Sequence, residues 1–207
     1  MKHFSFLILL CLLFGLSSTQ VLGQTTTPEK IRILFVGNSL TDYNDLPTKV
    51  ARMGTPDGRK IDVQSLTYAN YSLDDHLSNN KLQLLISNGK FDYVVIQQGP
   101  STGNTGKAAL IKDGKRISKM CNKAGSKLAF FMVWPSKNNL RLFDNVIQSY
   151  SEAAEQTNAL LCPVGQAWKD NIESKDDYSY YGDDGFHPSE RGSEVAATII
   201  YNTLFGK

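Results

Sequence analysis

Three residues near the two ends of this sequence have the types and spacing needed for nucleophilic chemistry. Ser39 follows an apolar run and the pair Gly-Asn, and Asp184 stands three residues before His187. A serine hydroxyl is a weak nucleophile until a neighbouring base takes its proton and a third group holds that base in the correct tautomer. The residue types therefore predict Ser39 as a nucleophile, His187 as its base and Asp184 as the group that orients the base.

The stretch from Gly37 to Thr41 has a second interpretation, as a loop that cradles a phosphate between a strand and a helix. It lacks the repeated glycines and the lysine of a P-loop. A nucleotide or flavin site would also leave Asp184 and His187 without a role. The nucleophile is the favoured interpretation, and the phosphate loop is the alternative.

The two histidines that follow residue 23 have different surroundings. His187 precedes Pro188, which disfavours helical geometry at the residue before it and suits the first turn of a following helix. His187 is thus expected in a loop that leads into the closing helix. His76 lies early in a predicted helix, where it has either a surface or helix-packing role or a direct part in catalysis.

The elements that must position these residues alternate along the chain. Near-continuous apolar runs predict strands covered on both faces, at residues 31–36, 61–68, 93–97, 128–134 and 160–164. Amphipathic stretches predict helices at residues 46–53, 73–87, 107–124, 142–157 and 189–204. This alternation indicates an α/β protein, a three-layer α/β/α sandwich with a central parallel sheet of about five strands. Ligands of such sheets bind outside the carboxyl ends of the strands.

Two blocks of the sequence carry a resemblance to a known family. "VGNSLTDYNDLP" near the start and "DDGFHPSERGSEVAA" near the end resemble the SGNH hydrolase superfamily, the GDSL-type esterases and lipases, and "CPVGQAWKDN" is similar to its secreted bacterial members. The resemblance implies a flavodoxin-like fold and hydrolysis of carboxylic esters through an acyl enzyme. It also implies a catalytic triad of Ser39, Asp184 and His187.

The two middle blocks depart from the family pattern, and they concern the oxyanion hole. Where the family has a glycine whose N–H is a donor, this chain has Asn70 or Ala69; where it has an asparagine side chain, Ser101 stands. "QQGPS" also resembles the sialate O-acetylesterase and acetylxylan esterase branch, which makes Gln98 a donor candidate. The expected donors are the N–H groups of Ser39 and Asn70 with Gln98 or Ser101, although neighbouring backbone groups could equally satisfy Gln98.

The expected substrate is a short O-acyl ester, such as acetyl on carbohydrate, because no long apolar lid appears in the sequence. Asn38 and Trp134 are predicted to contact this small-molecule or glycan ester. Trp134 could form a sugar-stacking rim with three tyrosines, although aromatic residues also serve as packing anchors; they are Tyr178, Tyr180 and Tyr181. A lipase, lysophospholipase or thioesterase of the same superfamily is an alternative. A carbohydrate-binding protein that kept the fold without turnover is another.

Residues 1–23 have the pattern of a signal peptide, with a basic start, an apolar stretch and a small polar end. The apolar stretch is shorter than the roughly 20 residues that a spanning helix needs, so no stable membrane anchor is expected. Residues 24–30 are a polar lead-in, and residues 31–207 are predicted to form one hydrolase domain. The expected location is periplasmic or extracellular.

Composition excludes some classes of partner. The whole chain has a net charge of +2, which gives no electrostatic footprint for nucleic acid or anionic lipid. Cys121 and Cys162 remain after residue 23; a disulfide and two buried thiols are both open, the thiols being favoured. No metal-ligand cluster is visible, so neither a metal nor a cofactor is expected. The oligomeric state is left open.

Overall fold

Five strands form one parallel sheet with the order β2-β1-β3-β4-β5. They are β1 (Ile31–Gly37), β2 (Ile61–Thr67), β3 (Tyr93–Ile96), β4 (Lys127–Phe131) and β5 (Leu160–Cys162). The computed structural model describes residues 30–206, so the predicted signal peptide and most of the lead-in lie outside the described residues. The predicted parallel sheet is confirmed.

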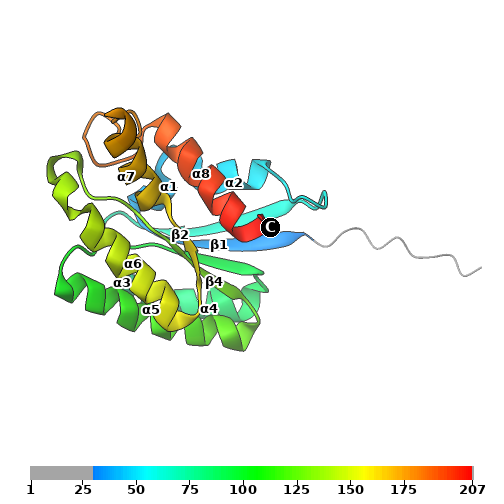
Figure 1. Cartoon of the computed structure of the whole chain (residues 1–207). Coiled ribbons are helices and arrows are strands. Elements are labelled where there is room, and N and C mark those ends of the chain that lie inside the picture. The colour runs from blue at the N-terminus through cyan, green and yellow to red at the C-terminus, as the bar shows by residue number, and fades with distance from the viewer. Residues whose placement is uncertain (1–29, 207) are drawn as a thin grey trace, which may run out of the picture.

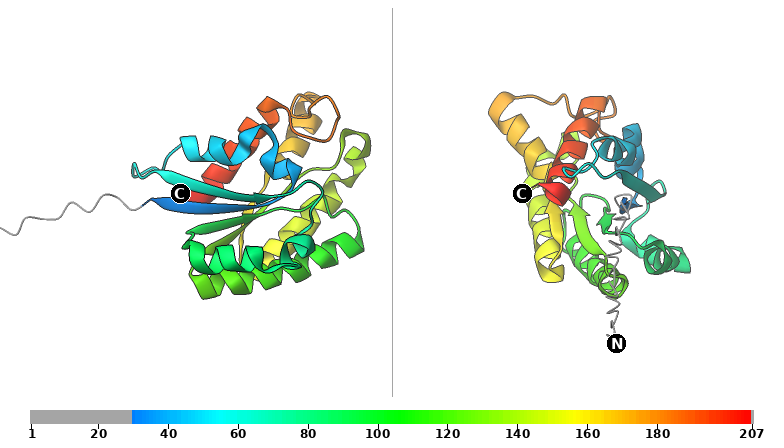
Figure 2. Two further views of the ribbon diagram at one scale, coloured as in Figure 1. Left: turned by 180° about the vertical axis from the view of Figure 1, so that it is seen from behind. Right: turned by 90° about the vertical axis from the view of Figure 1, so that its right-hand side faces the viewer.

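Helices cover both faces of the sheet, which makes the three layers of an α/β/α sandwich (Figure 1). On one side lie α2 (Leu46–Arg52), α7 (Val164–Lys175) and α8 (Glu190–Phe205). On the other side lie α3 (Leu73–Leu77), α4 (Asn80–Gly89), α5 (Asn104–Ala124) and α6 (Phe143–Thr157). Figure 2 shows from behind that α2 and α8 lie across the sheet from α4 and α5.

The central strands β1 and β3 are almost wholly apolar because both of their faces are covered, whereas the edge strand β2 carries the exposed polar residues Asp62, Gln64 and Ser65. In β1 every residue except Arg32 is buried, and Val94, Val95 and Ile96 of β3 are buried as well. The sheet therefore supplies the core, and its carboxyl edge is a rigid base for the loops that follow.

The chain leaves the centre of the sheet in two directions. From β1 it goes to β2 at one edge, whereas from β3 it goes through α5 to β4 on the other side. The crevice between the carboxyl ends of β1 and β3 is thus the topological switch point, where α/β sheets bind ligands. Ser39 lies directly beyond β1 at this point.

One helix prediction was wrong, and one helix was missed. The stretch 73–87 is not continuous: α3 ends at Leu77, and Asn79 begins α4 by accepting a hydrogen bond from the backbone N–H of Lys81. Helix α7 was not predicted, because a glycine in its first turn weakens the helical pattern. That residue, Gly165, lies so close to the Val133 carbonyl oxygen that a Cβ would be 2.1 Å from it.

Three short helical turns lie at the carboxyl edge of the sheet. They are α1 (Ser39–Asp42), η1 (Tyr43–Asp45) and η2 (Lys137–Leu142). None of the helices within residues 30–206 is long and apolar enough to cross a membrane.

Both cysteines of the described chain are buried free thiols. Burial raises the pKa of the Cys121 thiol and of the Cys162 thiol to about 12. The thiols are therefore protonated at neutral pH and serve as small apolar core groups.

Candidate active site

Ser39 is placed by the way β1 passes into helix α1. Asn38 is the N-cap of α1, and its side-chain oxygen accepts a hydrogen bond from the Leu40 backbone N–H at 3.1 Å. The Asn38 amide also donates to the Tyr71 carbonyl oxygen at 3.0 Å. Ser39 is therefore the first helical residue, directly above the end of a central strand. Asn38 lines the pocket beside Ser39, but its side chain holds the turn and the neighbouring loop.

A buried glutamine, Gln97, anchors this turn from the adjacent strand. Its side-chain oxygen accepts hydrogen bonds from the Asn38 backbone N–H at 3.0 Å and from the Thr41 hydroxyl at 2.8 Å. Gly37 is required here, because a Cβ at this position would lie 2.4 Å from both the Gln97 side-chain oxygen and the Thr41 hydroxyl. The sequence prediction named the neighbouring Gln98 instead; which of two adjacent glutamines faces β1 depends on strand register, which the sequence pattern did not reveal.

The structure brings Ser39, His187 and Asp184 together in one chain of hydrogen bonds. The Ser39 hydroxyl lies 2.8 Å from His187 Nε2, and His187 Nδ1 lies 2.5 Å from Asp184 Oδ2. The other carboxylate oxygen of Asp184 accepts the backbone N–H groups of Phe186 and His187, each at 2.9 Å. The predicted residues thus have the geometry of a serine, base and acid triad.

Electrostatics decides which way these hydrogen bonds run. The hydrogen bond from the His187 ring and those from the backbone N–H groups of Phe186 and His187 hold the pKa of Asp184 at about 2, below its ordinary value of 3.8. Asp184 is therefore a carboxylate at neutral pH and can only accept, so His187 Nδ1 carries a proton. In the neutral ring, Nε2 is then the acceptor for the Ser39 hydroxyl proton.

The loop that carries the base, residues 183–188, is anchored to the core by Trp134. The indole N–H donates to the Phe186 carbonyl oxygen at 3.0 Å, and the indole stacks on Trp168 with ring centroids 3.5 Å apart. Trp134 has 0% of its surface exposed. The prediction that Trp134 contacts substrate was wrong: β4 ends at Phe131, and the chain beyond it stays inside the protein.

The three tyrosines proposed for a sugar-stacking rim also have packing roles. The Tyr181 hydroxyl donates to the Pro135 carbonyl oxygen at 2.7 Å. Tyr178 lies below the Lys137 ammonium, and Tyr180 lies below the Arg191 guanidinium. None of the three lines either pocket at Ser39.

Beside Ser39 is a pocket of about 210 Å³. Its lining residues come from four loops at the carboxyl edge: Asn38, Ser39, Asn70, Tyr71, Ser72, Gly99 and Phe186. Asn70 has a left-handed backbone, with φ 64°, a conformation that glycine adopts freely and that asparagine tolerates better than most residues. Asn70 can thus replace the glycine of the family pattern without changing the course of the backbone. Ala69, the alternative, lines a separate hollow.

The backbone N–H groups of Ser39 and Asn70 are the available donors in this pocket. The Ser39 N–H opens a helix, so it has no intrahelical acceptor. Neither N–H has another acceptor among residues 30–206. Both are free to bind an oxyanion that forms beside the Ser39 hydroxyl.

Gln98 and Ser101, the other predicted donors, are bound to each other. The Gln98 amide donates to the Ser101 hydroxyl at 2.8 Å, and the Ser101 hydroxyl donates to the Gly99 carbonyl oxygen at 3.0 Å. Neither residue lines the pocket at Ser39. The pair shapes the loop that brings Gly99 to the pocket, so the structure gives it a supporting position and not one beside the nucleophile.

His76 packs beneath the nucleophile turn, so of its predicted roles the structure supports packing and not a surface position. It is buried, and its Nε2 atom lies 2.8 Å from the Gly37 carbonyl oxygen. Burial lowers the pKa of the imidazole, so the ring is neutral and donates this hydrogen bond. Tyr68 and Tyr71 pack around it. His76 supports the end of β1 and does not reach the Ser39 hydroxyl.

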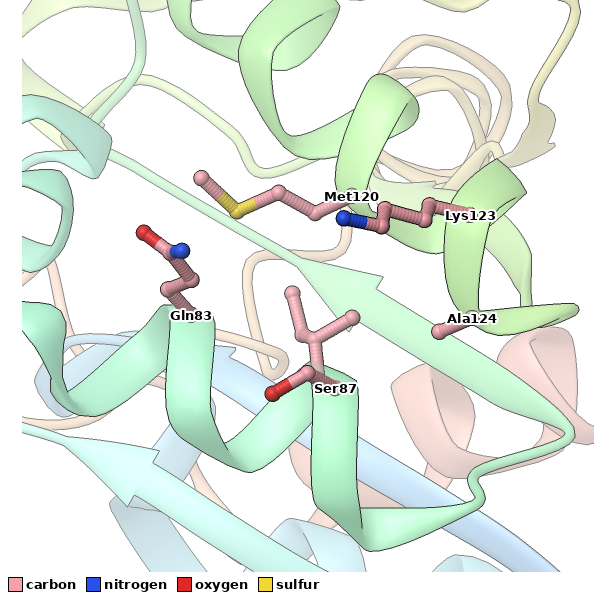
Figure 3. A pocket seen from close by; sticks show the side chains of 6 residues that line it. Gln83, Ser87, Met120, Lys123 and Ala124 are labelled. Carbon is pink, nitrogen blue, oxygen red and sulfur yellow. The ribbon is translucent and has the colours of Figure 1, made fainter.

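Away from this edge, a hollow of about 180 Å³ lies between α4 and α5 (Figure 3). It is lined by Gln83, Ile86, Ser87, Met120, Lys123 and Ala124. It holds no pairing of a nucleophile with a base. Within residues 30–206 no group of three or more His, Cys, Asp or Glu side chains could hold a metal ion.

No family model matches the sequence, and no curated protein matches it. Solved structures do match. A protein from Slackia heliotrinireducens, named as an SGNH hydrolase, is 24% identical with a TM-score of 0.73; the alignment covers 85% of this chain and 100% of that one. The chain has the SGNH hydrolase fold.

Two further neighbours with this fold have different named activities. A lipase/acylhydrolase from Enterococcus faecalis is 18% identical with a TM-score of 0.64, over 85% of this chain and 96% of that one. A catalytic mutant of an acetylxylan esterase from Geobacillus stearothermophilus is 14% identical with a TM-score of 0.64, over 84% of this chain and 94% of that one. Among these neighbours, the SGNH fold thus occurs both in a protein named as a lipase/acylhydrolase and in one named as an acetylxylan esterase.

Proposed function

We propose that this chain is a carboxylic ester hydrolase that uses Ser39 as its nucleophile. One observation carries the proposal: an unbroken series of hydrogen bonds joins the Ser39 hydroxyl, the His187 ring and the Asp184 carboxylate. His187 and Asp184 follow Ser39 by 148 and 145 positions in the sequence, so only the fold brings the three residues together. The named activities of the structural neighbours support the same reaction class.

The geometry suits a two-step acyl transfer. The Ser39 oxygen attacks the ester carbonyl while His187 Nε2 takes its proton, and the Asp184 carboxylate stabilises the imidazolium. The oxyanion binds the N–H groups of Ser39 and Asn70. His187 then gives the proton to the leaving alcohol, and a water molecule releases the acyl group with His187 again as base.

The pocket beside Ser39 supports a short acyl group. Its volume of about 210 Å³ is below the roughly 300 to 1,000 Å³ of sites that enclose drug-sized ligands. Its lining combines asparagine, serine and glycine with the aromatic residues Tyr71 and Phe186, so a short acyl group meets both polar and aromatic walls, whereas a long alkyl chain has only two apolar side chains to pack against. Acetyl is the acyl group that these walls suit best.

On the other side of Ser39, a smaller hollow of about 100 Å³ supports a hydroxyl-rich alcohol. Asp42, Thr67 and Tyr68 line it, and the Thr67 hydroxyl donates to the Asp42 carboxylate at 3.1 Å. An exposed carboxylate accepts hydrogen bonds from sugar hydroxyls and repels an anionic group. This arrangement favours an acetylated neutral sugar over a phospholipid.

Release of 4-nitrophenol from acetyl, butyryl and octanoyl esters tests the proposal, with Ser39→Ala and His187→Ala as matched variants. Acetate should be cleaved fastest, and both variants should fall to background while their unfolding curves match the wild type. Acetylated xylo-oligosaccharides and glucose pentaacetate are then tested for acetate release.

Other outcomes of the same assay select the alternatives. If the octanoyl ester is cleaved fastest, the protein is a lipase or acylhydrolase and not a carbohydrate esterase. Faster cleavage of an acyl thioester, assayed in parallel, would identify a thioesterase. A folded wild-type protein inert toward all these substrates would favour a carbohydrate-binding protein without turnover.

We also propose that residues 1–23 export the enzyme to the periplasm or the exterior, on the basis of their sequence pattern alone. Mass spectrometry of the protein from an expressing culture tests this. An N-terminus near Gln24 supports export; a retained residue 1 contradicts it.

A further inference from the structure

An exposed tyrosine, Tyr43, lies against the face of the His187 ring. The two ring centroids are 4.7 Å apart and the ring planes differ by 19°. Tyr43 is 44% exposed, so burial in the core does not explain its position. Among residues 30–206, the His187 imidazole is the aromatic ring on which it stacks.

The hydrogen bonds of the triad restrain one motion of the His187 ring only weakly. Ser39 and Asp184 bind the two ring nitrogens in the plane of the ring. They define an axis through the ring but resist tilting about that axis only weakly, because each bond tolerates a broad range of angles. A flat contact on the ring face restrains this tilt, and Tyr43 supplies it. On another side, Phe186 meets the ring nearly at a right angle.

The backbone next to Tyr43 is held in a costly conformation. Asn44 and Asp45 both have left-handed backbones, with φ 54° and φ 56°. Consecutive non-glycine residues in this region persist only where their surroundings hold them, and such strain gathers at functional sites.

Asn44 supplies the contacts that hold this segment. Its side-chain amide donates to the Pro188 carbonyl oxygen at 3.0 Å and to the Ser193 hydroxyl at 2.9 Å. Pro188 directly follows the base, and Ser193 is a buried residue of α8. Nearby, Lys49 of α2 pairs with Glu190 at the start of α8. Tyr43 is thus tied to the same short loop whose histidine it contacts.

We propose that Tyr43 and Asn44 form a clamp that positions the His187 ring for proton transfer. Tyr43 sets the tilt of the ring, and Asn44 fixes the distance between the nucleophile side of the site and the base loop. The proposal rests on the proposed function, because positioning has a kinetic effect only if His187 is the base. Tyr43 is a positioning residue: its hydroxyl has no part in the reaction.

Three variants separate stacking from other roles of these residues. Tyr43→Phe keeps the ring and removes the hydroxyl, whereas Tyr43→Leu removes the aromatic face. Asn44→Gly allows the left-handed backbone but removes the amide. Unfolding curves of all three are compared with the wild type first.

The decisive readout is the NMR spectrum of protein with isotope-labelled histidine, recorded beside kcat and KM. A proton above an aromatic face is shielded, so Tyr43→Leu should move the His187 ring resonances toward those of an unstacked histidine. The resonances of His76, packed against Tyr68 and Tyr71, should stay in place as the internal reference. Tyr43→Leu should lower kcat about 10-fold with little change in KM, because small misplacements of a reacting group have large rate effects.

The controls decide whether the clamp exists. Tyr43→Phe should keep the wild-type resonances and a kcat within about 2-fold of the wild type, and Asn44→Gly should move the His187 resonances and lower kcat as Tyr43→Leu does. Wild-type resonances in Tyr43→Leu, or moved resonances with unchanged kcat, would overturn the proposal. If the wild type cleaves no ester, the proposed function fails, and the resonances alone then decide whether Tyr43 holds the ring.

Discussion

The nucleophile turn, residues 37–42, and the base loop, residues 183–188, are held in place in different ways. The nucleophile turn continues a central strand, with Leu40 and Thr41 buried and Gln97, the residue after β3, bonded to it. In the base loop the Asp184 side chain is 51% exposed. The hydrogen bonds of this carboxylate run within the loop, and Trp134 and Asn44 join the loop to the rest of the protein.

This difference separates stability from activity. The position of Ser39 is part of the folded core, so changes beneath it should affect the free energy of unfolding as well as the rate. The position of His187 depends on a few contacts near the surface. Changes there should affect the rate and leave the fold largely unaltered.

The largest effect is expected for Asp184→Asn in the base loop. The amide can still accept the backbone N–H groups of Phe186 and His187, but it no longer stabilises the imidazolium or selects the proton on Nδ1. We expect kcat to fall about 10²- to 10⁴-fold. Steady-state kinetics and urea unfolding at pH 7 measure the two quantities. A loss of stability as severe as the loss of rate would contradict the separation of the two regions.

A smaller effect of the opposite kind is expected for Gln97→Met beneath the nucleophile turn. The substitution leaves the Asn38 N–H and the Thr41 hydroxyl buried without an acceptor. Each such group costs about 1 to 3 kcal/mol, and single substitutions rarely cost more than about 4 kcal/mol, so the free energy of unfolding should fall by about 2 to 4 kcal/mol.

Urea unfolding at pH 7 tests the Gln97 prediction, with Gln98→Met as the matched neighbour. Gln98 lies in the loop that follows β3, and its amide bonds to Ser101 instead of the nucleophile turn. The Gln98 variant should keep more of its activity. Equal effects of the two variants on both stability and kcat would show that Gln97 has no special relation to Ser39.

The smallest effect concerns acid. The Asp184 pKa is about 2 in the folded protein and about 3.9 in an unfolded chain, so its contribution to stability is complete above the unfolded pKa. It is lost as the pH falls through the folded pKa. Between pH 5 and pH 2 the wild type should lose slightly more stability than Asp184→Asn, as measured by urea unfolding. Parallel curves for the two proteins would contradict the lowered pKa.

The sheet could be predicted because a strand covered on both faces has a near-continuous apolar sequence, as in residues 31–36. Ser39, Asp184 and His187 could be identified because each stands in a short block with its own spacing. The error at Trp134 had the same origin as the success with the strands. The apolar run 128–134 contains a strand and a buried segment beyond it, and hydrophobicity does not separate the two.

The contacts of Gln97 and Tyr43 could not be predicted from the sequence pattern. Whether Gln97 or Gln98 faces β1 is a matter of register between strands 59 positions apart in the sequence. The Tyr43 ring meets a histidine from the far end of the chain, and no local periodicity indicates that meeting. The position of Asn70 could be predicted, because asparagine is among the few residues that tolerate the left-handed backbone of the glycine it replaces.

The stacked pair Trp134 and Trp168 gives the molecule an optical property. These are the two tryptophans of the whole sequence, both lie in the interior, and one indole N–H is bonded to the carbonyl oxygen of Phe186 beside the base. The intrinsic fluorescence of the protein therefore originates next to the base loop. Its emission wavelength and its quenching by acrylamide provide a label-free signal for the moment at which that loop leaves the core.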